Sequence, residues 1–259
     1  GAEYGTKSGP RGANFLCLMS GSPISADYIR DEGKAGRIGM RLLAIVAEGG
    51  RRRVYLSPTE EHELVAKSAQ PTWKPEVPFF QQALGFRVGN YGISTWADLF
   101  TSRQLVGLGT ISELVGKAKE KVRADASNVG WPDGDGLADG GSGAIAYGEA
   151  LAVYLAFALD RCADFSNTCT RWVPGNQKVM NLFGKQTVSM TWDFPEANIF
   201  LETVGGYVPA AKYVADCVET LPWNVSSGHA SQADAANNSI TCCIPDDCID
   251  ENRYPLFMA

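Results

Sequence analysis

The sequence predicts an α+β protein with a mostly helical core, a small β-hairpin and long loops. Apolar side chains recur at helical spacing from Leu105 to Val122, and a nearly uninterrupted apolar run fills residues 144–160. Two short apolar segments flank a pair of glycines within residues 42–57, which is typical of a hairpin. The chain has 259 residues, of which 45% are hydrophobic, so it is long enough to bury a core.

Charge is distributed unevenly along the chain. The net charge of −6 excludes a protein that is basic throughout, yet residues 1–60 hold nine Lys or Arg against six Asp or Glu. We therefore expect three segments. Residues 1–80 form a basic loop and β-hairpin region, residues 81–225 form the helical core, and residues 226–259 form an irregular acidic tail.

The basic region is expected to begin as a flexible loop. Basic residues recur every three or four positions within residues 27–41, but Gly33, Gly36 and Gly39 lie between them, and glycine disfavours a regular helix. Residues 42–57 then read as two short strands around a glycine pair, with three arginines directly after the turn. The pattern predicts a basic loop that leads into a basic hairpin.

Helices are expected after the hairpin. One begins within residues 57–67, where a proline and several acids occupy the first turn, whereas the proline-rich segment 71–80 is an extended connector. Thr101 and Gln104 have the spacing of a capping box, which predicts a helix over residues 101–124.

The second half of the chain predicts two further helices. Residues 128–143 form a loop by composition, and its Asp-Gly repeats do not make a calcium site, because Ala144 stands where an EF-hand needs Glu. The helix over residues 142–164 is apolar on nearly all sides, so we expect it at the centre of the core. Residues 207–221 form another amphipathic helix.

The stretch GKQTVSMTWDFPEANIF, residues 184–200, allows two interpretations. Val188 and Met190 alternate with polar residues and predict a short strand, after which Asp193 and Glu196 predict the capped start of a helix. A strand-to-helix turn is also a common ligand site, so a direct catalytic role stays open. An acidic cap would occupy the free N–H groups and repel phosphate, which favours the structural interpretation.

The cysteines and histidines do not define a catalytic or metal site. Seven cysteines without regular spacing, and no opening signal peptide, favour a reducing, cytoplasmic setting. Cys242, Cys243 and Cys248 supply three thiols where zinc usually takes four ligands, so we assign no metal ligand. His62 and His229 are far apart in sequence, and no nucleophile or phosphate-loop motif accompanies them. No run reaches the ~18 apolar residues of a membrane span.

The basic residues near the N-terminus predict a DNA-binding surface. Lysines and arginines placed beside DNA phosphates release condensed counterions and give salt-dependent binding. The candidate DNA contacts are Lys34, Arg37, Arg41, Arg51, Arg52 and Arg53. The alternative is a solvated hairpin tip that binds nothing.

Five long segments carry a family resemblance over roughly residues 12–220. They are CLMSGSPISADYIRDEGKAGRIGMRLLAIVAEG, RVYLSPTEEHE, NYGISTWADLFTSRQLVGLGTISELV, GSGAIAYGEALAVYLAFALDRCAD and FGKQTVSMTWDFPEANIF. In this order they resemble the central region of the adenine-specific DNA methylases that begin with a DUF1156 domain and often contain a zinc ribbon.

The resemblance implies an adenine-N6 DNA methyltransferase that uses S-adenosylmethionine and takes part in restriction-modification or phage defence. Double-stranded DNA would be its partner, together with other methylase segments or defence-system subunits. In that family a glycine-rich cofactor motif lies upstream of the matching region, and a catalytic Asp-Pro-Pro-Tyr motif lies downstream. Neither motif occurs in this chain.

We therefore expect a fragment of a larger methyltransferase that recognises DNA and supports the enzyme. By itself it is expected to hold no cofactor and to be inactive, and no catalytic residue is named. Near Cys17 the sequence C-L-M-S-G stands where relatives carry a paired-cysteine ribbon, so residues 1–80 would include a degenerate zinc-ribbon edge. The alternative is a non-enzymatic interaction module that binds a partner methylase subunit.

Overall fold

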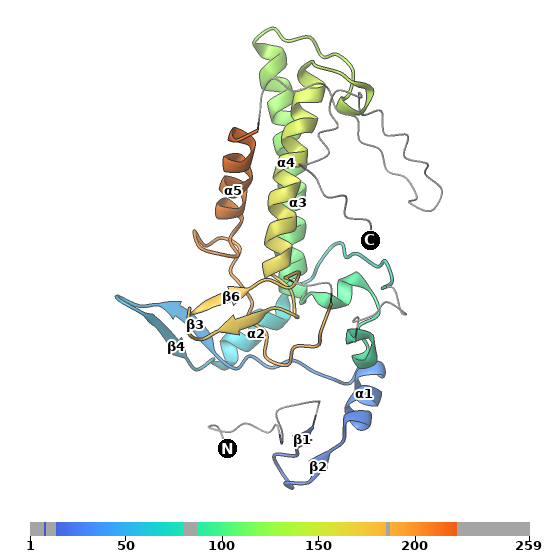
Figure 1. Cartoon of the computed structure of the whole chain (residues 1–259), viewed down its shortest axis with the longest axis vertical. Coiled ribbons are helices and arrows are strands. Elements are labelled where there is room, and N and C mark those ends of the chain that lie inside the picture. The colour runs from blue at the N-terminus through green and yellow to red at the C-terminus, as the bar shows by residue number, and fades with distance from the viewer. Residues whose placement is uncertain (1–7, 9–13, 80–86, 185–186, 222–259) are drawn as a thin grey trace, which may run out of the picture. The chain divides into compact units, whose positions relative to one another are not determined.

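The computed structural model describes residues 8, 14–79, 87–184 and 187–221 (Figure 1). All of these but residue 221 belong to one unit, residues 1–220. The acidic tail, with Cys242, Cys243, Cys248 and His229, lies outside the described residues. Within them the predicted mixture of helices and small antiparallel sheets is confirmed.

The described elements are five α-helices, three short 3₁₀ helices and three two-stranded sheets. The α-helices are α1 (Ala26–Lys34), α2 (Glu60–Ser68), α3 (Ser102–Asn128), α4 (Ala144–Phe165) and α5 (Tyr207–Glu219). The 3₁₀ helices are η1 (Val88–Tyr91), η2 (Trp96–Leu99) and η3 (Leu137–Asp139). The antiparallel strand pairs are β1 (Phe15–Leu16) with β2 (Pro23–Ile24), β3 (Ile45–Glu48) with β4 (Arg53–Leu56), and β5 (Arg171–Val173) with β6 (Lys178–Met180).

Helix α3 starts where its capping box predicts. The Thr101 hydroxyl accepts a hydrogen bond from the Gln104 N–H at 3.2 Å, and the Gln104 side-chain oxygen accepts one from the Thr101 N–H at 2.9 Å. The helix continues to Asn128, beyond the predicted end at residue 124, because Ala126 still packs into the interior. A cap that is readable in sequence thus fixed the start of this helix, while tertiary packing extended its end.

Helix α4 packs against both α3 and α5 (Figure 1). Their contact buries Ile111 of α3, Cys162 of α4 and Ile199 from the segment before α5. Near the other end of α4, Glu149 accepts hydrogen bonds from Lys119 Nζ at 3.2 Å and from the Leu137 N–H at 2.8 Å. The hydrogen bond from Leu137 is the larger cause, and the one from Lys119 the smaller, of a Glu149 pKa below its usual value. The carboxylate is therefore an anion that joins α3, α4 and the connecting loop.

Helix α4 is not surrounded on all sides, contrary to the prediction for residues 142–164. Packing against α3 and α5 covers two of its sides, but Tyr147, Tyr154 and Phe157 are exposed. Apolar residues on nearly all sides of α4 therefore did not result in burial of all of its sides. The predicted helix at residues 207–221 is confirmed as α5.

A second apolar cluster lies among the segments that precede α3 and follow α4. Its buried members are Phe79, Val88, Leu99, Cys169, Leu182 and Val188. The Thr168 N–H donates to the Leu99 carbonyl oxygen at 2.7 Å, which ties the end of α4 to η2. The expected connector 71–80 contains no helix over its described residues and forms one isolated bridge, between Pro78 and Thr95.

The expected loop at residues 27–41 begins as helix α1 instead. Ser25 caps it by accepting a hydrogen bond from the Tyr28 N–H at 3.2 Å, and Ile29 is buried. Gly33 lies in the last turn, where glycine disturbs a helix least, and the later glycines follow its end. The glycine spacing therefore misled the prediction for the first half of this segment.

The predicted strand and helix within residues 184–200 are also absent among the described residues. Asp193 caps no helix there, because the segment is held by side chains from elsewhere. Glu196 pairs with Arg103 of α3, and the Pro195 carbonyl oxygen accepts a hydrogen bond from the Thr170 hydroxyl at 3.1 Å. These long-range contacts replace the local capping box.

Candidate nucleic-acid interface

The predicted basic hairpin exists as β3 and β4. The pairing register places Val46 opposite Tyr55 and Glu48 opposite Arg53. The turn closes with a hydrogen bond from the Gly49 N–H to the Arg52 carbonyl oxygen at 3.0 Å. Antiparallel pairing with these partners confirms the hairpin expected at residues 42–57.

A second hairpin, β5–β6, contacts the first (Figure 1). Trp172 Nε1 donates a hydrogen bond to the Tyr55 hydroxyl at 3.2 Å, and the two rings lie edge-on with centroids 6.4 Å apart. At the turn of β5–β6, the Gln177 side-chain oxygen accepts a 3.5 Å hydrogen bond from the Arg53 N–H. The β5–β6 hairpin therefore fixes both β4 and the base of the arginine turn.

Three of the predicted DNA contacts gather on the β3–β4 turn. Arg51 and Arg52 are exposed, and Arg53 is partly buried where β4 begins. Within the described part of the chain, none of the three has an acidic partner at ion-pair distance. Glu48, opposite Arg53, is the neighbouring acid on the same face of the hairpin. The turn thus concentrates positive charge that no described side chain neutralises in an ion pair.

Arg37 and Arg41 are placed differently, beside acids. Arg37 forms two 2.7 Å hydrogen bonds to the carboxylate of Glu32, one from Nε and one from Nη2. These bonds lower the pKa of Glu32 and raise the pKa of Arg37, so both groups stay charged and paired. Arg41 is more loosely placed, with Nε 3.8 Å from a carboxylate oxygen of Glu63.

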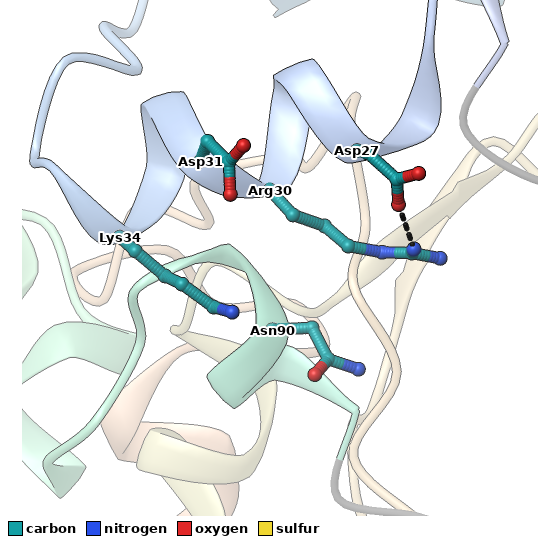
Figure 2. Close-up of a pocket in the computed structure, with 5 residues that line it drawn as sticks. All are labelled: Asp27, Arg30, Asp31, Lys34 and Asn90. Carbon is teal, nitrogen blue, oxygen red and sulfur yellow. Dashed lines mark hydrogen bonds and ion pairs between the residues drawn. The ribbon is translucent and has the colours of Figure 1, made fainter.

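Lys34 lines a shallow polar groove between α1 and η1 (Figure 2). The groove has a volume of about 480 Å³ and is bounded by Asp27, Arg30, Asp31, Lys34 and Asn90. Figure 2 shows Arg30 in an ion pair with Asp27, at 2.7 Å, and Lys34 extending from α1 toward η1. Two acidic and two basic side chains balance in charge, so this groove attracts an anion less strongly than the arginine turn does.

Sequence reasoning missed Tyr55 and Trp172 as members of the site. The signal for the second hairpin was present, because two short segments around Trp172 and Val179 flank a Pro-Gly-Asn turn. The contact between two hairpins that lie far apart in sequence has no local signal. Arg171 and Lys178 lie on the face of β5–β6 opposite Trp172, so they do not share a face with the aromatic pair.

The described residues do not form a metal site. No group of three His, Cys, Asp or Glu side chains lies close enough together to hold an ion. Cys17 is a free thiol in the β1–β2 turn, where hydrogen bonds donated by Ser20 to its sulfur lower its pKa. No helix in the described ranges is both long and apolar enough to cross a membrane.

Comparison with known proteins gives no match for this chain among family profiles, characterised protein sequences or solved structures. The functional assignment therefore depends on the residues described above. Among them, the arginine turn and the aromatic pair beside it form the most distinctive surface.

Proposed function

We propose that this chain is the DNA-recognition and scaffold portion of an S-adenosylmethionine-dependent adenine-N6 DNA methyltransferase. Arg51, Arg52 and Arg53 would contact backbone phosphates of double-stranded DNA, and other segments or subunits would supply methyl transfer. The observation that carries the DNA-binding part is the turn of three arginines without an acidic partner among the described residues. The methylase part draws its support from the sequence resemblance described above.

The described residues do not suit the cofactor of such an enzyme. A site for S-adenosylmethionine of the expected type needs a strand, a glycine-rich loop and a helix N-terminus in sequence. The described strands instead form three two-stranded antiparallel ribbons, and the sequence lacks the glycine-rich motif. We therefore assign no step of methyl transfer to this chain.

Salt-dependent DNA binding tests the proposal. Affinity for a short fluorescent duplex is measured at several salt concentrations for the wild type and for the triple variant Arg51→Ala, Arg52→Ala, Arg53→Ala. Each lost phosphate contact lowers the slope of log affinity against log salt by about one unit, so the triple variant should lose about two to three units. Its affinity at low salt should fall by more than about tenfold.

A matched variant separates a specific surface from general attraction. Lys117→Ala, Lys121→Ala and Lys212→Ala remove the same charge from exposed positions on α3 and α5. This variant should keep nearly the wild-type slope. Equal losses in both triple variants, or no loss in either, would reject the arginine turn as the DNA contact.

A methyl-transfer assay tests the division of labour. The purified chain is incubated with DNA and radiolabelled S-adenosylmethionine, and incorporation of label is counted. No incorporation is expected from the chain alone, because groups that position an adenine beside the cofactor are missing from its sequence. Incorporation by the chain alone would reject the proposal.

A second candidate function is an interaction module for a partner methylase subunit. It is favoured by helix α2, which has no buried residue and exposes Leu64 (69%) and Val65 (60%). Co-purification with such a subunit, in the absence of salt-dependent DNA binding, would favour this function over the first. Loss of co-purification in Leu64→Lys would assign the contact to α2.

A further inference from the structure

Tyr55 presents an aromatic ring next to the arginine turn. It lies near the centre of β4, and 53% of the residue is exposed. Side chains two positions apart on a strand point to the same face, so Tyr55 shares a face with Arg53. An exposed ring and a cation are thus neighbours on one short strand.

The exposed ring is also held in place. Trp172 donates a hydrogen bond to the Tyr55 hydroxyl at 3.2 Å, and the two ring planes meet at 87°. Because the rings are nearly perpendicular, Trp172 restrains Tyr55 without stacking on it. A ring that is already oriented loses little conformational freedom when a ligand stacks on it.

The surroundings of the ring indicate what would stack on it. Arginines at the turn attract phosphate, and an aromatic face beside them suits a nucleobase. In a fully paired duplex each base is covered by its neighbours, so a protein ring gains little from them. An unpaired nucleotide offers both a free base face and a phosphate.

We propose that Tyr55 is a stacking platform for an unpaired nucleotide, with the turn arginines holding the adjacent phosphates and Trp172 acting as a positioning residue. This inference rests on the proposed DNA-binding function and narrows its substrate. The surface binds a duplex that contains an unpaired stretch more tightly than a fully paired duplex of the same length. A stacked base accounts for a preference of roughly tenfold.

Two DNA molecules of equal length test the inference, one fully paired and one with a central bubble of unpaired nucleotides. Wild-type protein should bind the bubble roughly tenfold more tightly. Tyr55→Leu keeps an apolar side chain but removes the aromatic face, so it should abolish the preference, measured as the ratio of the affinities for the two DNA molecules. Tyr55→Phe retains the aromatic face but loses the hydroxyl that accepts the Trp172 hydrogen bond, so it should keep a reduced preference.

Further variants separate stacking from a general loss of structure. Trp172→Phe removes the same hydrogen bond from the donor side, so it should reduce the preference about as much as Tyr55→Phe does. Tyr28→Leu, at an exposed tyrosine on α1, is the matched control and should bind both DNA molecules as the wild type does. Circular dichroism melting identifies any variant that unfolds. If Tyr55→Leu unfolds, the bubble preferences of Tyr55→Phe and Trp172→Phe test the stacking platform in its place.

The outcomes distinguish this inference from the function on which it rests. Arginine-dependent binding with equal affinity for both DNA molecules would overturn the stacking platform and leave the proposed function standing. A bubble preference that survives in Tyr55→Leu would overturn the role of Tyr55. Failure to bind either DNA molecule would overturn both.

Discussion

Gly33 of α1 and Gly92, directly after η1, lie with their backbones in contact. A Cβ at Gly33 would come within 2.5 Å of the Tyr91 carbonyl oxygen, and Gly92 adopts a left-handed conformation with φ of +89°. The approach is possible because neither residue has a side chain. It sets the position of α1, and with it Lys34, against the segment that precedes α3.

Replacing Gly33 by alanine should destabilise the protein by about 1–3 kcal/mol, because the added methyl group meets backbone that cannot move aside cheaply. The free energy of unfolding is measured by chemical denaturation. Gly116→Ala is the control, since a Cβ at that helical position in α3 meets nothing within 4 Å. It should stabilise by about 0.5–1 kcal/mol. Equal stability of the two variants would contradict the Gly33 contact.

Thr101→Ala should lower the free energy of unfolding by about 1 kcal/mol, because it removes the acceptor for the Gln104 N–H. Thr110→Ala serves as the control within the same helix. Its exposed hydroxyl donates to the Val106 carbonyl oxygen, which already belongs to the helical hydrogen-bond pattern. A thermal melt that shifts equally for both variants would argue against the capping box as a source of stability.

Local signals in the sequence predicted those elements whose stability is local. The capping box of α3 needs residues three positions apart, and the β3–β4 hairpin needs two short segments around one turn. The acidic pair Asp193 and Glu196 shows the same local pattern as a helix start. There, however, the ion pair between Glu196 and Arg103 links positions that are far apart in sequence. Tertiary contacts of this kind override a local preference and leave no local trace.

The candidate site likewise was predictable only in its local part. The cluster Arg51 to Arg53 is visible in the sequence, and its turn follows from the glycines before it. The acids that neutralise Arg37 and approach Arg41 are Glu32 and Glu63, and only the folded chain brings them into place. The contact between Tyr55 and Trp172 spans two hairpins, so it too required the structure.

Stability should fall as pH rises from about 9 to about 11, and two buried thiols contribute to the loss. Burial raises the pKa of both Cys162 and Cys169 to about 11, from 9.0 in water. Between these values the unfolded thiols release their protons while the folded thiols keep them. The unfolded state therefore binds fewer protons, and the free energy of unfolding decreases with pH, by on the order of 1 kcal/mol per pH unit for each thiol.

The double variant Cys162→Ala, Cys169→Ala isolates this contribution. Urea unfolding at several pH values should give a smaller decrease above pH 9 than in the wild type, even though the variant is less stable at neutral pH. Cys217→Ala, at an exposed free cysteine, should keep the wild-type pH dependence. If the double variant and the wild type lost stability in parallel above pH 9, the buried thiols would not be responsible.

Glu48→Gln should tighten DNA binding. Glu48 lies directly opposite Arg53 on the same face of the β3–β4 hairpin. Its carboxylate would therefore face the same phosphate as the Arg53 guanidinium. The carboxylate therefore repels the ligand that the arginines attract, whereas glutamine keeps the size of the side chain and removes the charge. Affinity for a duplex should rise by about two- to fivefold at low salt, and the gain should shrink as salt screens the repulsion.

Glu113→Gln on α3 makes the same change in net charge at an exposed position away from the hairpin. If it tightened binding as much as Glu48→Gln, the effect would come from net charge and not from the turn. Combining Glu48→Gln with the Arg51, Arg52 and Arg53 alanine substitutions sharpens the test. Without the arginines no phosphate is bound next to Glu48, so removing the Glu48 charge should no longer increase the affinity in that background. A gain that persists would place the DNA elsewhere on the molecule.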